Sequence, residues 1–182
     1  MKGFRLFILL FVSGVVIDQL VKVWVRESIP QGGSMRGLPI PNVFELTLTY
    51  NKGIAFGLFQ GAGVFMAPVA IAIAGGAGWY SFKHPRETNW MHAAMGLLAA
   101  GAIGNLYDRL VHQRVTDMFW FRGLEIGGNR YGEFAVFNIA DACITVATIM
   151  LMIVWWRDAI RQKNEPPAAA KIGDEAPASD SV

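Results

Sequence analysis

The chain has 182 residues, of which 53% are hydrophobic and only 16% are charged, and its formal net charge is +2. Soluble domains carry roughly 25% charged residues, so this composition excludes an ordinary soluble domain. The small net charge and the lack of a long basic run give no reason to expect a nucleic-acid partner. The single cysteine, Cys143, excludes an internal disulfide and a cysteine-cluster metal site.

Hydropathy predicts four membrane spans. The stretch from Gly53 to Phe82 contains no charged residue and exceeds the roughly 20 residues that cross a bilayer core, which indicates a membrane protein. The first span is expected to be uncleaved rather than a signal peptide, because no Ala-x-Ala-like site follows it. The predicted spans, in chain order, are about Phe4 to Val25, Ala62 to Phe82, Thr88 to Tyr107 and Phe134 to Trp156.

The expected fold is an all-α polytopic membrane protein, with four transmembrane helices and a small periplasmic β-sheet on the membrane surface. Residues 1–163 form the membrane-embedded domain, and residues 164–182, rich in proline, alanine and acidic residues, form a disordered cytoplasmic tail. Basic residues at Lys2, Arg5 and residues 83–86 crowd against span ends, which favours both termini in the cytoplasm. The total numbers of basic residues on the two sides are nearly equal and do not decide the orientation.

Two segments are expected outside the membrane core. Residues Asn42 to Tyr50 alternate apolar and polar side chains, which predicts a half-buried strand, and the two prolines of residues 38–41 exclude a helix interior there. The segment from Arg109 to Glu133 contains Phe119-Trp120-Phe121 and several glycines. We expect it at the membrane interface, where aromatic side chains collect.

Polar residues inside the predicted spans gather at one level. Ionisable side chains in a span cost about 2.5 to 3.5 kcal/mol each on insertion scales, so each needs a physical reason. In an up-and-down bundle the end of the first span, the end of the third and the start of the fourth lie together near the outer face. The residues concerned are Asp18, Lys22, Asn105, Asp108, Arg109, Asn138 and Asp141.

Spacing divides these residues into pairs. Asn138 and Asp141 are three apart, which places them on the same side of one helix. Asp18 and Lys22 are four apart and are interpreted as a structural ion pair. Asp108 has only Arg109 as a sequence neighbour, and adjacent helical residues do not face each other, so its partner must lie elsewhere.

Two carboxylates have no dedicated cation. Asp141 has no cation within a helical turn, and Asp117, just outside the third span, has only Arg114. Two carboxyl groups close together in a poorly hydrated place are least costly when they share one proton. Sharing raises the pKa of one group and leaves the pKa of the other low. Aspartic peptidases use this state: the charged member draws a proton from water while the neutral member polarises the scissile carbonyl.

Other interpretations stay open at this point. A single intramembrane aspartate can merely bond a neighbouring helix, as in a structural membrane subunit, and a small proton-coupled carrier also uses membrane aspartates. A Ser/Lys dyad of Lys22 with Ser28 or Ser34 has no supporting motif. The sequence contains neither a His-Glu-x-x-His motif nor the Gly-x-Gly-Asp motif of another aspartic membrane peptidase class.

Five motifs occur in order along residues 4–157. They are Asp18-Gln19-x-x-Lys22, Asn51-Lys52-Gly53-Ile54-Ala55-Phe56, Gly104-Asn105-Leu106-Tyr107-Asp108-Arg109, Val115-Thr116-Asp117 and Phe137-Asn138-Ile139-Ala140-Asp141. Each motif alone is weak, but together they closely resemble the bacterial lipoprotein signal peptidases, also called signal peptidase II. Three departures from the family pattern are Ile54, Met118 and a longer segment between the two aspartates, with residues 122–132 as an insertion.

The resemblance implies a multi-pass aspartic peptidase of the bacterial inner membrane, with both termini cytoplasmic and the active site near the periplasmic face. Such an enzyme needs no metal or cofactor and cuts lipidated prolipoprotein signal peptides just before the diacylglyceryl cysteine. Membrane lipids are further partners, and the peptide antibiotic globomycin is the inhibitor expected for this family. By position, the catalytic pair is Asp117 and Asp141, the substrate-binding residues are Asn51, Asn105, Arg109 and Asn138, and the supporting residues are Asp18, Lys22, Gly104 and Asp108.

Overall fold

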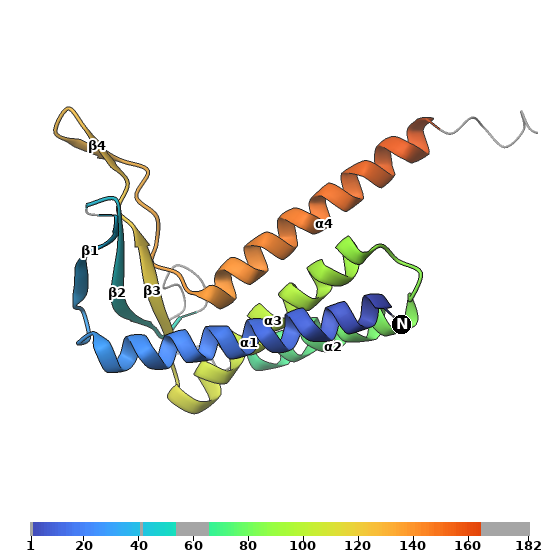
Figure 1. Ribbon diagram of the computed structural model, residues 1–182, viewed down its shortest axis with the longest axis horizontal. Coiled ribbons are helices and arrows are strands. Elements are labelled where there is room, and N and C mark those ends of the chain that lie inside the picture. Colours follow the sequence, from blue (N-terminus) through green and yellow to red (C-terminus); the bar gives the residue numbers. More distant parts are fainter. Residues whose placement is uncertain (1, 41, 54–65, 165–182) are drawn as a thin grey trace, which may run out of the picture.

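The computed structural model describes residues 2–40, 42–53 and 66–164, without the side chains of residues 36–39. Within that part of the chain, four helices and two small antiparallel sheets alternate, as Figure 1 shows. The helices are α1 (Lys2–Ser28), α2 (Ala67–Lys83), α3 (Asn89–His112) and α4 (Ile139–Asn164). The strands are β1 (Ser34–Ile40), β2 (Phe44–Asn51), β3 (Val115–Phe121), β4 (Leu124–Ile126) and β5 (Asn129–Tyr131).

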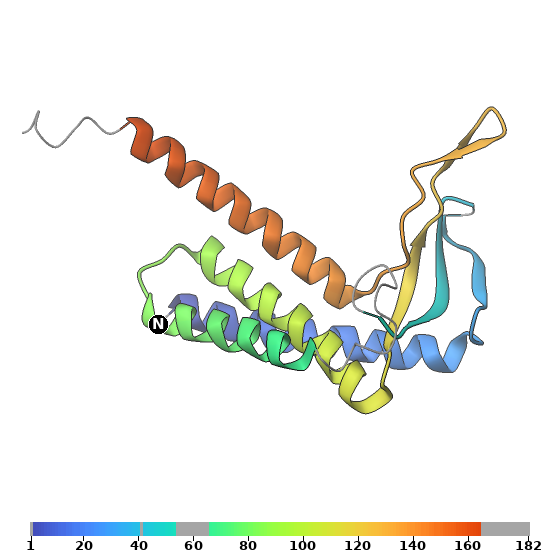
Figure 2. The same ribbon diagram turned by 180° about the vertical axis from the view of Figure 1, so that it is seen from behind.

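Helix α3 is the centre of the helical layer, because α1, α2 and α4 all pack against it. Its buried face consists largely of alanine and glycine, which lets neighbouring backbones approach closely. A Cβ on Gly96 would lie 2.8 Å from the carbonyl oxygen of Phe7 in α1, and a Cβ on Gly101 would overlap the carbonyl oxygen of Ala140 in α4. Helix α4 contacts α3 near its own start and then diverges from the other three helices (Figures 1 and 2).

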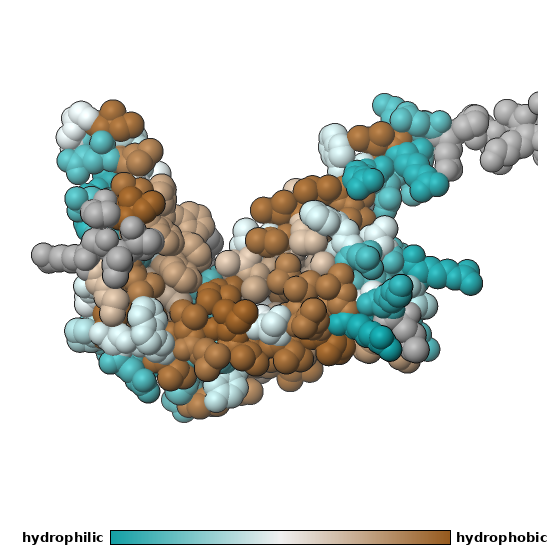
Figure 3. Space-filling model, viewed as in Figure 1, coloured by the Kyte–Doolittle hydropathy of each residue, from teal (hydrophilic) through white to brown (hydrophobic). Residues whose placement is uncertain are grey.

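The outer surface of the helices is apolar. Large hydrophobic side chains such as Leu9, Trp79 and Met152 are exposed, and Figure 3 shows a broad hydrophobic area over the helices on the face in view. Helices α1 and α4 are each long and apolar enough to cross a membrane. The described part of α2 is 17 residues long, and residues 62–65 of the second predicted span lie outside the described residues. The count of four spans therefore stays a prediction.

The predicted start of the fourth span was wrong. Hydropathy placed it at Phe134, whereas α4 begins at Ile139 and the preceding residues are extended. Phe137 forms an antiparallel bridge with Phe119 of β3, with the Phe137 amide 3.0 Å from the Phe119 carbonyl oxygen. The apolar residues 134–137 lie along the edge of the sheet next to β3. Hydropathy alone cannot distinguish such an extended apolar segment from the first turn of a buried helix.

The larger sheet has the strand order β1-β2-β3. Strand β2 confirms the strand predicted at Asn42 to Tyr50, and β3 was not predicted from the sequence. A register irregularity between Leu46 and Thr49 brings Thr49 opposite Asp117. Leu46, Leu48 and Met118 pack with Val25 and Ile29 at the end of α1, so this sheet is attached to the helices by an apolar core.

The division into domains stays a prediction. Helix α4 continues to Asn164, and residues 165–182, predicted as a tail, lie outside the described residues. Residues 54–56 of the second motif lie outside them too, and with them the departure at Ile54.

Replacing Gly101 by alanine tests the contact between α3 and α4. The added methyl group would collide with the backbone of Ala140 and with Cγ1 of Ile144, 2.5 Å away, so we expect a loss of about 1–3 kcal/mol in unfolding free energy. The matched control is Gly75→Ala in α2, where nothing lies within 4 Å and a gain of up to about 1 kcal/mol is expected from helix propensity. Thermal unfolding in detergent measures both; equal melting temperatures would contradict the close packing.

Candidate active site

A buried lysine joins α1 to α3 at the end of the bundle that carries the sheet. Lys22 is fully buried, and its ammonium nitrogen lies 2.8 Å from Oδ2 of Asp18 and 3.3 Å from Oδ2 of Asp108. The same nitrogen donates a hydrogen bond to Oδ1 of Asn105, 3.2 Å away. The sequence prediction of an Asp18–Lys22 ion pair is confirmed, and Asp108 has its expected partner on another helix. Gly104 leaves room for this ion pair, because a Cβ at that position would lie 2.8 Å from Oδ2 of Asp18.

Asp108 also fixes the start of β3. Its Oδ2 accepts a hydrogen bond of 2.9 Å from the backbone amide of Thr116, the residue before Asp117. Arg26 completes this contact, with its guanidinium 3.8 Å from Oδ1 of Asp108 and 2.9 Å from the hydroxyl of Thr116. Sequence analysis missed Arg26 and Thr116. The available signal was the i, i+4 spacing from Asp18 through Lys22 to Arg26, which places all three on one face of α1.

Asn138 and Asp141 form a reciprocal cap at the start of α4. The backbone amide of Asp141 donates to Oδ1 of Asn138 over 2.9 Å, and the amide of Asn138 donates to Oδ2 of Asp141 over 3.2 Å. This is the geometry of a capping box. Asn138 therefore precedes the helix rather than lying on its face, which corrects the prediction made from the spacing. The amide of Ala140 donates to Oδ1 of Asp18 over 2.9 Å, so the ion cluster and the helix start are joined.

Two asparagine amides connect the candidate catalytic aspartates. Asn138 Nδ2 donates to Asp117 Oδ1 over 2.7 Å, and Asn105 Nδ2 donates to Asp141 Oδ1 over 2.8 Å. A further bond of 3.1 Å runs from Asn138 Nδ2 to Asn105 Oδ1. Lys22 has only donors, so it holds the oxygen of Asn105 toward itself and directs the NH₂ group to Asp141. The capping bond to the amide of Asp141 orients Asn138 in the same way, with its NH₂ group toward Asp117.

Both aspartates face one groove. A cavity of about 600 Å³ is lined by Asp117 and Asp141 together with mainly apolar residues of the segment 134–137 and the first two turns of α4. It lies where β3 and the start of α4 meet, and Figure 3 shows the surface hollowed between the sheet and α4. Asp117 is only 4% exposed. The arrangement presents two carboxyl groups to an elongated, mostly apolar ligand.

The surroundings shift the titration of Asp117. Burial and the nearby charge of Asp141 raise the pKa of Asp117 to about 7, and the hydrogen bond from Asn138 acts in the opposite direction. Asp117 on β3 therefore retains a proton at pH values at which an ordinary aspartate is ionised. Among the described residues no group of three or more His, Cys, Asp and Glu side chains is placed to hold a metal ion.

Of the other two predicted substrate-binding residues, one lines the groove and the other, Arg109, is not among its lining residues. Asn51, at the end of β2, lines the groove, and its Oδ1 accepts a bond of 2.9 Å from the amide of Gly53. Arg109 donates to the carbonyl oxygen of Asn105 at 3.3 Å and to that of Gly53 at 3.5 Å. Arg109 thus joins the end of α3 to the loop that follows β2.

Comparison with known proteins agrees with this site. The family model described as signal peptidase (SPase) II matches residues 10–157, which include every site residue named above. The chain belongs to the signal peptidase II family. Lipoprotein signal peptidases from Streptococcus pneumoniae and Clostridium acetobutylicum are 35% and 31% identical to it, over 79% and 80% of this chain and 88% and 90% of theirs.

Solved structures agree as well. A bacterial membrane enzyme determined by the in meso method at 2.3 Å resolution superposes with a TM-score of 0.76 and 29% identity, covering 88% of this chain and 93% of that one. A second, at 1.9 Å, superposes with a TM-score of 0.69 and 31% identity, covering 84% and 93%. The protein is thus a membrane peptidase of this family.

The raised pKa of Asp117 makes stability depend on pH. A carboxyl group with a folded-state pKa of about 7 and an ordinary value of 3.8 favours the folded state when protonated, so this contribution is present at acidic pH and is lost as pH rises toward 7. Asp117→Asn keeps an acceptor for Asn138 and removes the titration. We expect it to be more stable than wild type at pH 8 by roughly 2–4 kcal/mol, and equal to it near pH 4.

Thermal unfolding as a function of pH measures this difference. The matched control is Asp158→Asn, at an exposed position in the last part of α4, which should follow the wild-type curve. Parallel pH curves for wild type and Asp117→Asn would show that Asp117 titrates normally.

Proposed function

We propose that the protein is an aspartic endopeptidase that removes signal peptides from diacylglyceryl-modified prolipoproteins, cutting before the lipidated cysteine. One observation carries this proposal: Asp117 and Asp141 both accept hydrogen bonds from Asn138 at the wall of a mostly apolar groove. Membership in the signal peptidase II family, and relatives that are lipoprotein signal peptidases, support the substrate class.

Asp117 is proposed to hold the proton that the pair shares. Its carboxylate accepts one side-chain hydrogen bond, and its pKa is raised to about 7. The carboxylate of Asp141 accepts one hydrogen bond from Asn105 and one from the backbone of Asn138. The two aspartates therefore have different surroundings, as an acid and a base acting together require.

Hydrolysis then proceeds in two chemical steps, each of which includes two proton transfers. Ionised Asp141 takes a proton from a water molecule, whose oxygen attacks the carbonyl carbon before the cysteine, while Asp117 donates its proton to the carbonyl oxygen. The product is a neutral geminal diol held by both carboxyl groups. Asp141 next returns its proton to the amide nitrogen as the C–N bond breaks, and Asp117 recovers a proton from the diol. No acyl-enzyme forms, and the pair returns to its starting state.

Asn105 and Asn138 are assigned to positioning the dyad. The NH₂ group of Asn105 donates to Asp141. The NH₂ group of Asn138 donates to Asp117 and to Oδ1 of Asn105, so both of its hydrogens are used. Asn51, which lines the groove, and Arg109, which contacts the loop after β2, are proposed to hold the extended substrate backbone. The acyl chains of the substrate would remain in the bilayer beside the exposed apolar surface of α4, where Val146 and Ile149 lie.

The position of the sheet supports a proposal for the orientation in the membrane. The dyad lies at the end of the helices that carries the β1-β2-β3 sheet, and both ends of the described chain lie at the other end (Figure 1). We propose that the sheet end faces the periplasm and that both termini are cytoplasmic in the bacterial inner membrane. Globomycin is proposed to inhibit by occupying the groove. A proton-coupled carrier would instead need its carboxylates near the membrane midplane, with access to both sides.

Replacing either aspartate should abolish processing. Asp117→Asn and Asp141→Asn each remove one of the two carboxyl groups that exchange protons, so we expect cleavage of a lipidated precursor to fall roughly 10³-fold or more. The assay follows conversion of precursor to mature lipoprotein by purified enzyme at equal concentrations, with Asp158→Asn as the control. Full activity in Asp117→Asn would reject the assignment, and unchanged maturation in both variants would favour a structural membrane subunit.

Activity should also fall as pH rises. Because the mechanism needs Asp117 protonated and its pKa is raised to about 7, kcat/KM should decline above that pH. The measurement is the initial rate of precursor cleavage at low substrate concentration between pH 5 and about pH 9, with melting curves to confirm that the enzyme stays folded. A rate that stays constant up to the alkaline limit would contradict the assignment of the proton to Asp117.

A further inference from the structure

The β4–β5 hairpin, in the segment between the two aspartates, has two chemically different faces. Its register pairs Leu124 with Tyr131 and Glu125 with Arg130. Directly paired residues share a face and alternate residues return to it, so Leu124, Ile126 and Tyr131 lie on one face, called here the apolar hairpin face. Asn129, which pairs with Ile126, is the polar residue of this face. Glu125 and Arg130 lie on the other and form an ion pair of 3.6 Å.

The apolar hairpin face has no cover within the described residues. Leu124, Ile126 and Tyr131 are 51%, 63% and 57% exposed. An isolated two-stranded hairpin is marginally stable in water. The turn helps, since Gly127 and Gly128 both adopt the positive φ angles that a tight hairpin turn requires. The exposed apolar side chains nevertheless call for an apolar partner.

The hairpin is held in a defined direction by its base. Arg122 forms an ion pair of 2.7 Å with Glu45 of β2, and its backbone amide donates to the carbonyl oxygen of Val43 over 2.8 Å. On the return strand, the amide of Phe134 donates to the carbonyl oxygen of Phe121 over 2.9 Å. Gly123 permits a close crossing, because a Cβ there would overlap the carbonyl oxygen of Tyr131.

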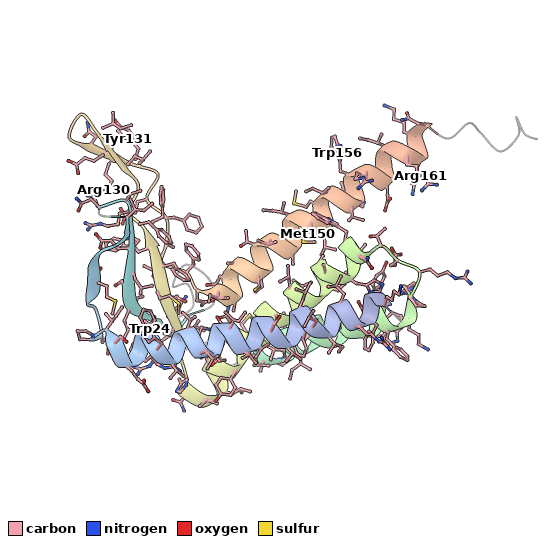
Figure 4. The ribbon with its side chains drawn as sticks, viewed as in Figure 1. Trp24, Arg130, Tyr131, Met150, Trp156 and Arg161 are labelled. Atoms are coloured by element: carbon pink, nitrogen blue, oxygen red, sulfur yellow. The ribbon has the colours of Figure 1, made fainter. Side chains whose placement is uncertain are left out.

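The hairpin projects sideways from the end of the helices that carries the larger sheet. The strands of the larger sheet run across the helix direction, and the hairpin extends beyond the helices on the side toward which α4 leans (Figures 1 and 2). Figure 4 shows Arg130 and Tyr131 at this extended end. In Figure 3 the hydrophobic surface of this arm lies on the side toward α4, and the hydrophilic surface lies on the opposite side.

We propose that the apolar hairpin face rests in the interfacial layer of the lipid bilayer, next to the mouth of the groove. The exposed apolar surface of α4 lies across the hollow from this face in Figure 3, and a tyrosine with an apolar ring and a polar hydroxyl suits the boundary between acyl chains and headgroups. Glu125 and Arg130 then face water. Lipid is favoured over a protein partner because the apolar face points toward the membrane region rather than away from it.

The position also suggests what the contact does. The hairpin leads directly into residues 134–137, which line the groove beside the aspartates. Contact with the lipid surface therefore keeps that side of the groove against the membrane from which a lipid-anchored substrate enters. This functional part rests on the proposed peptidase activity, whereas the lipid contact itself does not.

Depth-dependent quenching tests the contact without any activity assay. Because the chain has a single cysteine, Cys143→Ala provides a background in which Ile126→Cys and Glu125→Cys are labelled separately with an environment-sensitive fluorophore. The labelled full-length proteins are placed in nanodiscs of phosphatidylcholine and phosphatidylglycerol, with or without lipids spin-labelled near the headgroup. We expect blue-shifted emission and several-fold stronger quenching at position 126 than at position 125.

Each other outcome overturns the proposal. Equal, water-like emission at both positions would show that the hairpin stays in solution. Blue-shifted emission at position 126 without quenching by the spin-labelled lipids would indicate a protein surface, either a second copy or another chain, as the partner.

A second experiment separates the lipid contact from the chemistry. The double variant Leu124→Asp with Ile126→Asp should cleave lipidated precursor several-fold more slowly than wild type in nanodiscs and at the wild-type rate in detergent, where no bilayer surface exists. The matched control, Glu125→Gln with Arg130→Gln, should match wild type in both. An equal loss in detergent and nanodiscs would reject the role in substrate delivery. Inactive Asp117→Asn with normal quenching at position 126 would leave the lipid contact intact.

Discussion

The structure depends on one buried ammonium group. Lys22 has no exposed surface, and removing such a charge from water is costly unless it is fully compensated. Asp18, Asp108 and the amide oxygen of Asn105 provide that compensation, each at 3.3 Å or less. The same three residues then act outward: Asp18 accepts from the first turn of α4, Asp108 accepts from the first residues of β3, and Asn105 donates to Asp141. One charge thus sets the positions of both catalytic candidates.

The two aspartates occupy different kinds of local structure. Asp117 lies on a strand, and Asp141 belongs to a capping box at a helix start. The two aspartates lie on different elements, so local secondary structure does not place one next to the other. The hydrogen-bonded cluster around Lys22 and the side-chain amide of Asn138 bring them together. Their surroundings also differ, because Asp117 is buried with a raised pKa while the carboxylate of Asp141 accepts two hydrogen bonds from amide groups.

Much of the polar cluster was predictable from the sequence. Charged residues are rare in apolar spans, and their positions along each span indicate how deep they lie in the membrane. The Asp18–Lys22 pair, the strand at β2 and the common polar level all followed from spacing. The start of α4 and the strand β3 did not, because the apolar segments 134–137 and 118–121 carry the same hydropathy whether they enter a helix or a sheet. Arg26 was missed because a basic residue near a span end is usually a solvated one.

Below about pH 7 the aspartate pair is proposed to share one proton, which Asp117 carries. Infrared difference spectroscopy of the full-length protein in lipid bilayers, titrated through neutral pH, observes the C=O stretch of a protonated carboxyl group directly. We expect a band that disappears as pH rises through about 7 and that is absent from Asp117→Asn. A band that persists unchanged in Asp117→Asn, or no titrating carboxyl band in the wild-type protein, would contradict it.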